Sequence, residues 1–359
     1  MVAENCFRGR EVWLREQSVM GENMMRREFL RGTFGVAGAS LLSEVAMGLG
    51  GGAVVTSPLT KVTDGSIDIR EFHRMRRFAD LPMARVAYVE RGKGPVALFL
   101  HGFPLNGYQW RGALERLSPY RRCIAADFMG LGYTHAPADA DVSLPAQVEM
   151  LAALLDHLKI DEVDLVANDS GGLIAQLFVA KHGSRVRTLL LTNCDVDENS
   201  PPAAFVPLIQ SAKQPGVADR FIAPQVKDKS FARTDKGLGV AYTRPAQLAD
   251  ETIDVYFEPL VRSQDRKEQF SRYLLAFEPN LLVPIRPQLK EFRKPVHMVW
   301  ATSDIFFDAK WAEWLDRTLP GSRGVRRIEG AKLFFPEEMP DVIAEEALRL
   351  WGISPLPRK

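Results

Sequence analysis

The stretch VANDSGG, residues 166–172, begins at the end of the apolar run VDLVA and leads into LIAQLFVAKH, residues 173–182. An apolar run, a turn of small residues and a second apolar run predict a strand, a sharp turn and a helix. Two side chains in that turn, Asp169 and Ser170, carry nucleophilic groups. This stretch therefore bears on both the fold class and the candidate chemistry.

Runs of the same two kinds alternate along the chain from about residue 66. Strands that alternate with helices and read as continuous apolar runs predict a mostly parallel sheet with both faces covered. Two runs near the start, residues 67–78 and 83–92, predict a hairpin. The remaining strand-like runs are PVALFLHGF (95–103), RRCIAADFMG (121–130), VRTLLLTNC (186–194), PVHMVWATSD (295–304) and VRRIEGA (325–331), and LPAQVEMLAALLDHLKI (144–160) has helical spacing.

The pattern changes between Asp195 and about Asn280, where it becomes helical without a strand period. This change predicts a helical insertion between two strands of the sheet. We expect an N-terminal extension, a core in two parts and a cap. Their bounds are 1–60 for the extension, 61–197 for the first part of the core, 198–280 for the cap and 281–359 for the second part.

The extension contains MMRREFLRGTFGVAGA, residues 24–39, in which Arg26-Arg27 precedes a stretch rich in Ala and Gly. This arrangement resembles a twin-arginine export signal and implies a periplasmic or exported protein. Residues 1–23 are then an over-extended start, with Met24 or Met25 as the true one. The alternative is a disordered amphipathic tail on a cytoplasmic protein.

Composition narrows the classes of partner. The formal net charge is +1, which gives no electrostatic basis for binding nucleic acid. Cys6, Cys123 and Cys194 have neither the spacing of metal ligands nor that of a disulfide framework. The sequence contains no run of eighteen uncharged apolar residues, so it predicts no membrane-spanning helix in the mature protein. We expect a small-molecule substrate, no metal and no cofactor, and the oligomeric state stays open.

Four landmarks, in order, resemble the α/β-hydrolase fold over about residues 66–353. They are HGFP (101–104), DFMGLGYT (127–134), VANDSGG (166–172) and ATSDIFF (301–307). The resemblance implies an eight-stranded, mostly parallel sheet flanked by helices, with a helical cap inserted after strand 6. It also implies an oxyanion loop at HGFP, a nucleophile elbow at VANDSGG and a supporting acid, Asp304, in ATSDIFF.

The family's elbow pattern, small-x-nucleophile-x-Gly, fits Ala167-Asn168-Asp169-Ser170-Gly171 best. An Asp in that place resembles the haloalkane dehalogenases, epoxide hydrolases and fluoroacetate dehalogenases, whose carboxylate forms an ester intermediate. The resemblance implies Asp169 as nucleophile and the backbone N–H groups of Phe103 and Ser170 as the oxyanion hole. An Asp that only caps the following helix is the alternative.

The base of such enzymes, a His after the last strand, is replaced by Leu333 in GAKLFFPEE, residues 330–338. Among the six His residues only His135 lies near the expected edge of the sheet. The usual halide-binding residues of dehalogenases are also absent, since Phe103 and Ser170 occupy those places. Epoxide hydrolases use two Tyr from the cap, and the insertion offers Tyr242, Tyr256 and Tyr273 as candidate substrate-binding residues.

We therefore expect an enzyme of the haloalkane dehalogenase and epoxide hydrolase type, with Asp169 acting on a small apolar substrate and with impaired hydrolysis. Three alternatives stay open. One is a non-catalytic ligand-binding protein on a hydrolase scaffold. Another is a lyase or isomerase in which Asp169 is a general acid or base. The third is an esterase with Ser170 as nucleophile.

Overall fold

A computed structural model describes residues 67–354 of the 359-residue chain. The twin-arginine-like segment lies outside the described residues. Within them, eight strands form one sheet in the order β1-β2-β4-β3-β5-β6-β7-β8. The strands are β1 Arg76–Asp80, β2 Arg85–Arg91, β3 Val96–Leu100, β4 Arg122–Ala126, β5 Val163–Asp169, β6 Val186–Cys194, β7 Val296–Ala301 and β8 Ser322–Ile328.

The sheet is parallel except at β2, which pairs antiparallel with β1 and with β4. Every residue of β3, β5 and β7 is buried, as the continuous apolar runs predict for strands covered on both faces. The eight-stranded, mostly parallel architecture expected from the sequence is therefore confirmed.

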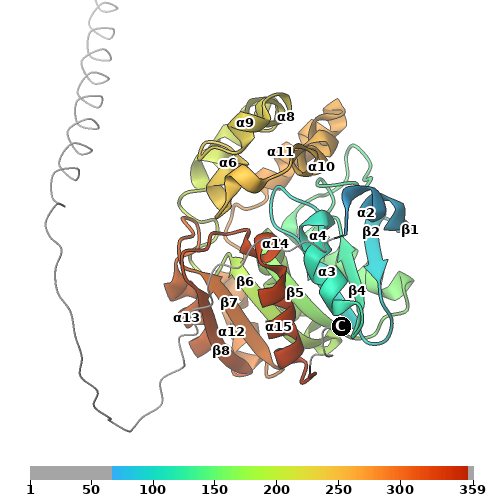
Figure 1. Cartoon of the computed structure of the whole chain (residues 1–359), viewed down its shortest axis with the longest axis vertical. Coiled ribbons are helices and arrows are strands. Elements are labelled where there is room, and N and C mark those ends of the chain that lie inside the picture. The colour runs from blue at the N-terminus through green and yellow to red at the C-terminus, as the bar shows by residue number, and fades with distance from the viewer. Residues whose placement is uncertain (1–66, 355–359) are drawn as a thin grey trace, which may run out of the picture. The chain divides into compact units, whose positions relative to one another are not determined.

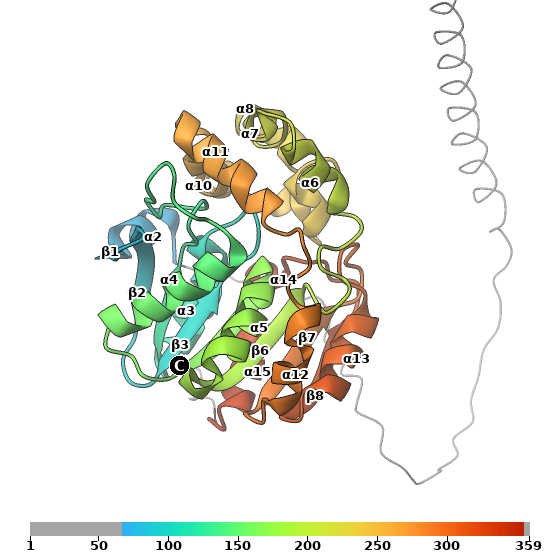
Figure 2. The ribbon, with the colours of Figure 1, turned by 180° about the vertical axis from the view of Figure 1, so that it is seen from behind.

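Helices cover both faces of the sheet. α3 (Arg111–Leu117) and α15 (Pro340–Leu350) pack together on the face toward the viewer in Figure 1. α4 (Leu144–His157) and α5 (Ser170–His182) lie over the opposite face, which Figure 2 shows. α12 (Arg286–Glu291) packs on α5, and α13 (Ala309–Thr318) packs on β7 and β8.

The first hairpin is shorter than expected. Residues Ile69–Met75 form a helix, α2, and only β1 and β2 make the hairpin. The helix begins at Asp68, whose carboxylate accepts a hydrogen bond from the backbone N–H of Glu71 at 2.8 Å. The segment forms a helix and not the expected strand because the side chain of Asp68 caps the first turn of α2.

Between β6 and β7 the chain leaves the sheet and forms a group of helices beyond the carboxyl ends of the strands (Figure 1). These cap helices are α6 Val206–Ala212, α7 Val217–Phe221, α8 Ala223–Lys227, α9 Lys229–Ala232, α10 Asp250–Val261 and α11 Gln264–Leu275. They fall inside the stretch that the sequence assigns to the cap. From residue 67 to residue 354, no helix is long and apolar enough to span a membrane.

The short helix α14 (Phe335–Glu338) joins the cap to the core. The buried Glu337 carboxylate accepts hydrogen bonds from the hydroxyls of Tyr242 and Tyr256 and from the guanidinium of Arg111. Glu338 accepts from the backbone N–H groups of residues 243 and 244. The cap is thus held over the sheet by two neighbouring carboxylates.

Candidate active site

The turn after β5 is sharp and its apex is Asp169. This residue has φ 55° and ψ −131°, a backbone conformation that L-amino acids rarely adopt. Asp169 therefore stands at the apex of the turn, as the elbow pattern predicts, and Ser170 is the first residue of α5. A non-glycine residue held in this conformation is most often kept for function.

Glycine is required at both positions that follow Ser170, because α5 packs closely on the sheet. A Cβ atom on Gly171 would lie 2.4 Å from the carbonyl oxygen of Leu100 in β3. A Cβ atom on Gly172 would lie 2.3 Å from the Cβ atom of Cys194 in β6. The spacing of small residues around Asp169 thus follows from backbone contacts, which is why the register argument places the apex correctly.

Two backbone donors converge on one oxygen of Asp169. The N–H of Phe103 donates to Oδ1 at 2.8 Å, and the N–H of Ser170 donates to the same atom at 2.5 Å. These are the two N–H groups expected to form an oxyanion hole. Burial raises the pKa of the Asp169 carboxyl to about 6, and the two backbone donors oppose that rise. The group is therefore mostly ionised at neutral pH and poorly solvated.

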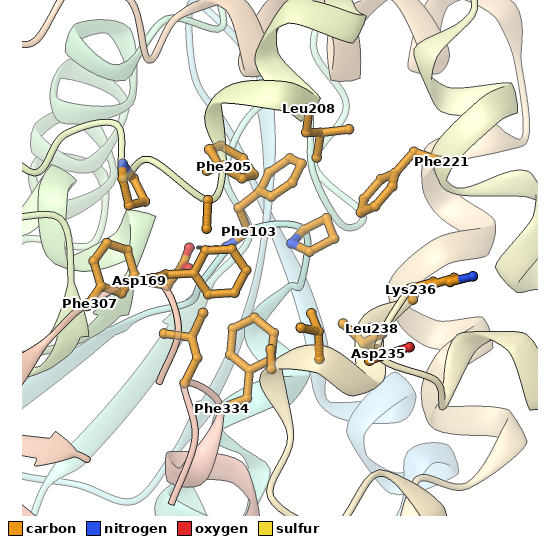
Figure 3. Close-up of a pocket in the computed structure, with 18 of the residues that line it drawn as sticks. Phe103, Asp169, Phe205, Leu208, Phe221, Asp235, Lys236, Leu238, Phe307 and Phe334 are labelled. Atoms are coloured by element: carbon orange, nitrogen blue, oxygen red, sulfur yellow. Dashed lines mark hydrogen bonds between the residues drawn. The ribbon is translucent and has the colours of Figure 1, made fainter. Parts of the chain in front are cut away.

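Asp169 lies in a wall of a cavity of about 160 Å³ between the sheet and the cap. Figure 3 shows the Asp169 carboxylate, with its hydrogen bond from Phe103, among the rings of Phe103, Phe205, Phe307 and Phe334. The cap contributes further apolar side chains and two charged ones, Asp235 and Lys236, which Figure 3 places on the side far from Asp169. An apolar chamber of this kind suits a small uncharged ligand.

A second carboxyl group, Asp195, lines the same cavity. It follows directly after β6, is 1% exposed, and its Oδ1 atom has no hydrogen-bond partner within the described residues. Burial raises its pKa well above the usual range, and the nearby charge of Asp169 raises it further. The sequence analysis did not single out Asp195, which has no motif of its own. Its place just after a strand was the one available signal, because ligands bind at the carboxyl ends of the strands in such sheets.

Asp304, the expected supporting acid, lies in the loop after β7 and does not line the cavity. Its Oδ2 accepts from the side-chain amide of Asn193 at 2.8 Å, and its Oδ1 accepts from the backbone N–H of Phe306 at 2.8 Å. Burial raises the pKa of Asp304 to about 7. Leu333, which stands where the enzymes that the chain resembles have their His, is buried and lines the cavity with Asp169.

The three cap tyrosines do not line the cavity. Tyr242 and Tyr256 are buried against Glu337 and anchor the cap, which differs from the substrate-binding role that the sequence analysis considered. Tyr273 lies nearer the elbow, because its hydroxyl is 3.4 Å from Ser170 Oγ. Ser170 is fully buried, and it is not one of the cavity-lining residues.

None of the six His residues lines the cavity, and all six are described. His101 is fully buried and structural, since its Nε2 accepts from the backbone N–H of Phe128 and its Nδ1 lies 2.9 Å from the carbonyl oxygen of Gly102. His135 is exposed beside Arg262. Residues 67–354 contain no group of three His, Cys, Asp or Glu side chains that could hold a metal ion.

Comparison with known proteins agrees with this geometry. The family model described as alpha/beta hydrolase fold matches residues 95–338. A solved structure of an alpha/beta hydrolase fold protein from Burkholderia ambifaria superposes with a TM-score of 0.66 at 22% identity, covering 79% of this chain and 98% of that one. That likeness supports the fold alone.

Curated relatives carry three different enzyme names. A haloalkane dehalogenase of Mesorhizobium japonicum is 33% identical over 189 residues, covering 51% of this chain and 58% of the relative. Epoxide hydrolase 2 of Caenorhabditis elegans is 25% identical over 74% of this chain and 77% of its own. A cis-3-alkyl-4-alkyloxetan-2-one decarboxylase of Xanthomonas campestris pv. campestris is 27% identical over 73% of this chain and 90% of its own. The homologues named haloalkane dehalogenase and epoxide hydrolase support a hydrolase-type function.

Proposed function

The chain belongs to the α/β-hydrolase fold family, and from that premise we propose that Asp169 is its nucleophile, acting on a small apolar substrate. The carboxylate attacks a carbon atom that bears a halide or a strained ring oxygen and forms an ester. The bond from that carbon to the halide or the ring oxygen breaks, so that the halide leaves as an anion or the ring oxygen becomes a hydroxyl with a proton from water. The observation that carries this proposal is the position of Asp169. It combines a positive φ, two backbone donors and a place in the wall of an apolar cavity.

The hydrogen bonds give the two oxygens of the Asp169 carboxylate different roles. Both backbone donors bind Oδ1, so the lone pairs of Oδ2 are the ones left to attack carbon. When water later adds to the ester carbonyl, the same donors stabilise the negative charge that develops on Oδ1. The low polarity of the cavity strengthens both effects, because few other dipoles compete.

The cavity sets the substrate class. Its wall beside Asp169 is built of phenyl rings, and a volume of about 160 Å³ admits only a small molecule. A substrate bearing a charge would lose its hydration there without a partner near Asp169. Haloalkanes and epoxides, the substrates named for two relatives, fit this description and carry an electrophilic carbon.

Release of the ester is the impaired step. With Leu333 in the place of the usual His, no imidazole is present in the cavity to take a proton from water. General-base assistance contributes about 10²- to 10⁴-fold. We therefore expect the ester on Asp169 to form readily and to persist at neutral pH.

Mass spectrometry of the intact protein tests the proposal. After incubation with a panel of bromoalkanes and epoxides, the wild type should gain the mass of one alkyl or hydroxyalkyl group. Asp169→Asn keeps the shape of the side chain and should gain nothing. Leu333→His should shorten the lifetime of the adduct if the new imidazole reaches Asp304. Absence of any adduct or turnover across the panel would instead indicate a ligand-binding protein.

A second candidate reaction is favoured by the same missing base. Decarboxylation of an oxetan-2-one, the substrate named for the Xanthomonas relative, yields an alkene and carbon dioxide and consumes no water. Such chemistry needs no group to activate water, so Leu333 would be no obstacle. Incubation with a cis-3,4-dialkyl oxetan-2-one and gas chromatography of the alkene distinguishes the two, since hydrolysis gives a hydroxy acid instead.

A further inference from the structure

Asp195 is a carboxyl group of the cavity to which the proposed attack by Asp169 gives no role. It has no hydrogen-bond partner for Oδ1 among the described residues, although it is almost fully buried. A buried polar atom without a partner is destabilising and calls for an explanation. A buried carboxyl with an unpartnered oxygen is unfavourable beside a second carboxyl, unless a ligand or a water molecule donates a hydrogen bond to that oxygen.

The fold fixes its position relative to Asp169. In the pairing of β5 with β6, Asp169 lies opposite Cys194. Cys194 packs its side chain against α5 at Gly172, and successive side chains along an extended chain point to opposite sides. Asp195 therefore points away from α5, and it lines the cavity that also holds Asp169.

We propose that Asp195 is a catalytic residue that activates water to hydrolyse the Asp169 ester, a role that rests on the proposed function of Asp169. Its unpartnered Oδ1 accepts a hydrogen bond from a water molecule in the cavity. The Asp195 carboxylate takes a proton from that water, and the hydroxide adds to Cγ of Asp169. The bond from Cγ to the alkyl-bearing oxygen then breaks. The alcohol leaves with the proton returned by Asp195. Asp169 is left as a carboxylic acid, which releases its proton to water at a pH above its pKa of about 6 and is then again a carboxylate.

Asp304 is the rival for this role, and its contacts argue against it. Both oxygens of Asp304 already accept hydrogen bonds, and the residue does not line the cavity. Asp235 lines the cavity from the cap on the side far from Asp169. Asp195 alone combines an unpartnered oxygen with a place in the cavity next to the elbow, among the residues described.

The charge state of Asp195 gives the proposal a distinctive pH dependence. Burial raises its pKa well above the usual range, so the fraction of Asp195 in the basic, ionised form grows as the pH rises through that raised pKa. Esterification of Asp169 removes the neighbouring negative charge and eases that ionisation. The titratable groups near the two carboxyls are Cys194, Tyr273 and Asp304, and Asp235 and Lys236 face the same cavity from the cap.

The test follows release of the ester rather than its formation. The wild type and Asp195→Asn are first loaded with bromohexane near neutral pH, and the decay of the adduct is then measured by mass spectrometry from neutral to alkaline pH. In the wild type the decay rate should rise with pH and level off once Asp195 is ionised. In Asp195→Asn it should be about 10²- to 10⁴-fold slower at the plateau. The variant should keep only the direct attack of hydroxide, which rises without a plateau.

The outcomes separate this inference from the proposal beneath it. Asp265→Asn, which changes an exposed aspartate of α11, should decay as the wild type does, and circular dichroism should confirm that all variants are folded. Equal decay of the adduct in Asp195→Asn and wild type overturns the role of Asp195 and leaves Asp169 as nucleophile. Slow decay in Asp304→Asn with normal decay in Asp195→Asn assigns the base to Asp304 instead. Failure of the wild type to form either an adduct or a hydrolysis product overturns the proposed function itself.

Discussion

The reactivity of this site depends on where single carboxyl groups sit. Asp169, Asp195 and Asp304 lie at or just after the ends of three adjacent parallel strands, β5, β6 and β7. Asp169 and Asp195 are buried, and Asp304 is half-buried. Their hydrogen bonds separate them. Asp169 has two backbone donors, Asp304 has an amide and a backbone donor, and Asp195 Oδ1 has none among the described residues. Asp169 is therefore the carboxyl best held as an anion at neutral pH.

Ester formation should follow the ionisation of Asp169. Its pKa is raised to about 6, so the nucleophilic form is lost as the pH falls through 6 and gained as it rises. We expect the rate of adduct formation with a bromoalkane to fall about tenfold per pH unit well below 6 and to be constant well above it. Mass spectrometry of samples quenched at successive times measures this rate, over a range from about pH 4.5 to about pH 8 that brackets the raised pKa. A rate that does not change across pH 6 would show that another group attacks.

Sequence reasoning succeeded for residues whose backbone is constrained and failed for those set by packing. The apex at Asp169 was predictable because this register places the small residue Ala167 two positions before the nucleophile, whereas the register with Ser170 at the apex places Asn168 there. The cap tyrosines were not, because short cap helices carry no register that tells which side chain faces the cavity. Asp195 was overlooked because it follows an apolar strand without any motif of its own.

At the scale of elements, α14 decides how the cap sits on the core. It follows the loop that carries Leu333, and its two carboxylates hold the segment 242–244 of the cap. The same small region therefore supplies part of the cavity wall and the anchor for the cavity's lid. This explains why aromatic residues of the cap, Tyr242 and Tyr256, are buried away from the cavity.

Removal of the Glu337 carboxylate should loosen this joint. Glu337→Ala leaves the guanidinium of Arg111 and two buried hydroxyls without their acceptor, so we expect a loss of roughly 3 kcal/mol in the free energy of unfolding. Glu313→Ala is the matched control, because its pair with Arg327 is exposed and should contribute less than about 1 kcal/mol. Urea denaturation of both variants measures the difference. Equal midpoints for Glu337→Ala and Glu313→Ala would contradict the anchoring role.

At the scale of the whole molecule, the alternation of apolar strands and helices was enough to predict the architecture. The four motifs HGFP, DFMGLGYT, VANDSGG and ATSDIFF were enough to predict the order of its functional loops. The first hairpin was partly misread, because Asp68 caps a helix where alternation suggested a strand. The N-terminal extension lies outside the described residues, so its role as an export signal is still a proposal from the sequence.

Export is testable independently of catalysis. A fusion of residues 24–60 to a folded reporter should reach the periplasm, because a twin-arginine signal directs proteins that have already folded. Replacement of Arg26 and Arg27 by Lys should keep the charge and block transport. Fractionation of cells measures both. If the fusion with the unchanged sequence stays in the cytoplasm, residues 24–60 are not an export signal.

The central claim is that Asp169, and not its neighbour Ser170, forms the covalent bond to substrate. Tryptic digestion after incubation with bromohexane places both residues in one peptide, residues 160–181, because the flanking cleavage sites are Lys159 and Lys181. Fragmentation of that peptide shows whether the added hexyl group is on Asp169 or on Ser170. We predict the added mass on Asp169 in the wild type and no modified peptide in Asp169→Asn. A hexyl group on Ser170, or an adduct that survives in Asp169→Asn, would contradict the account.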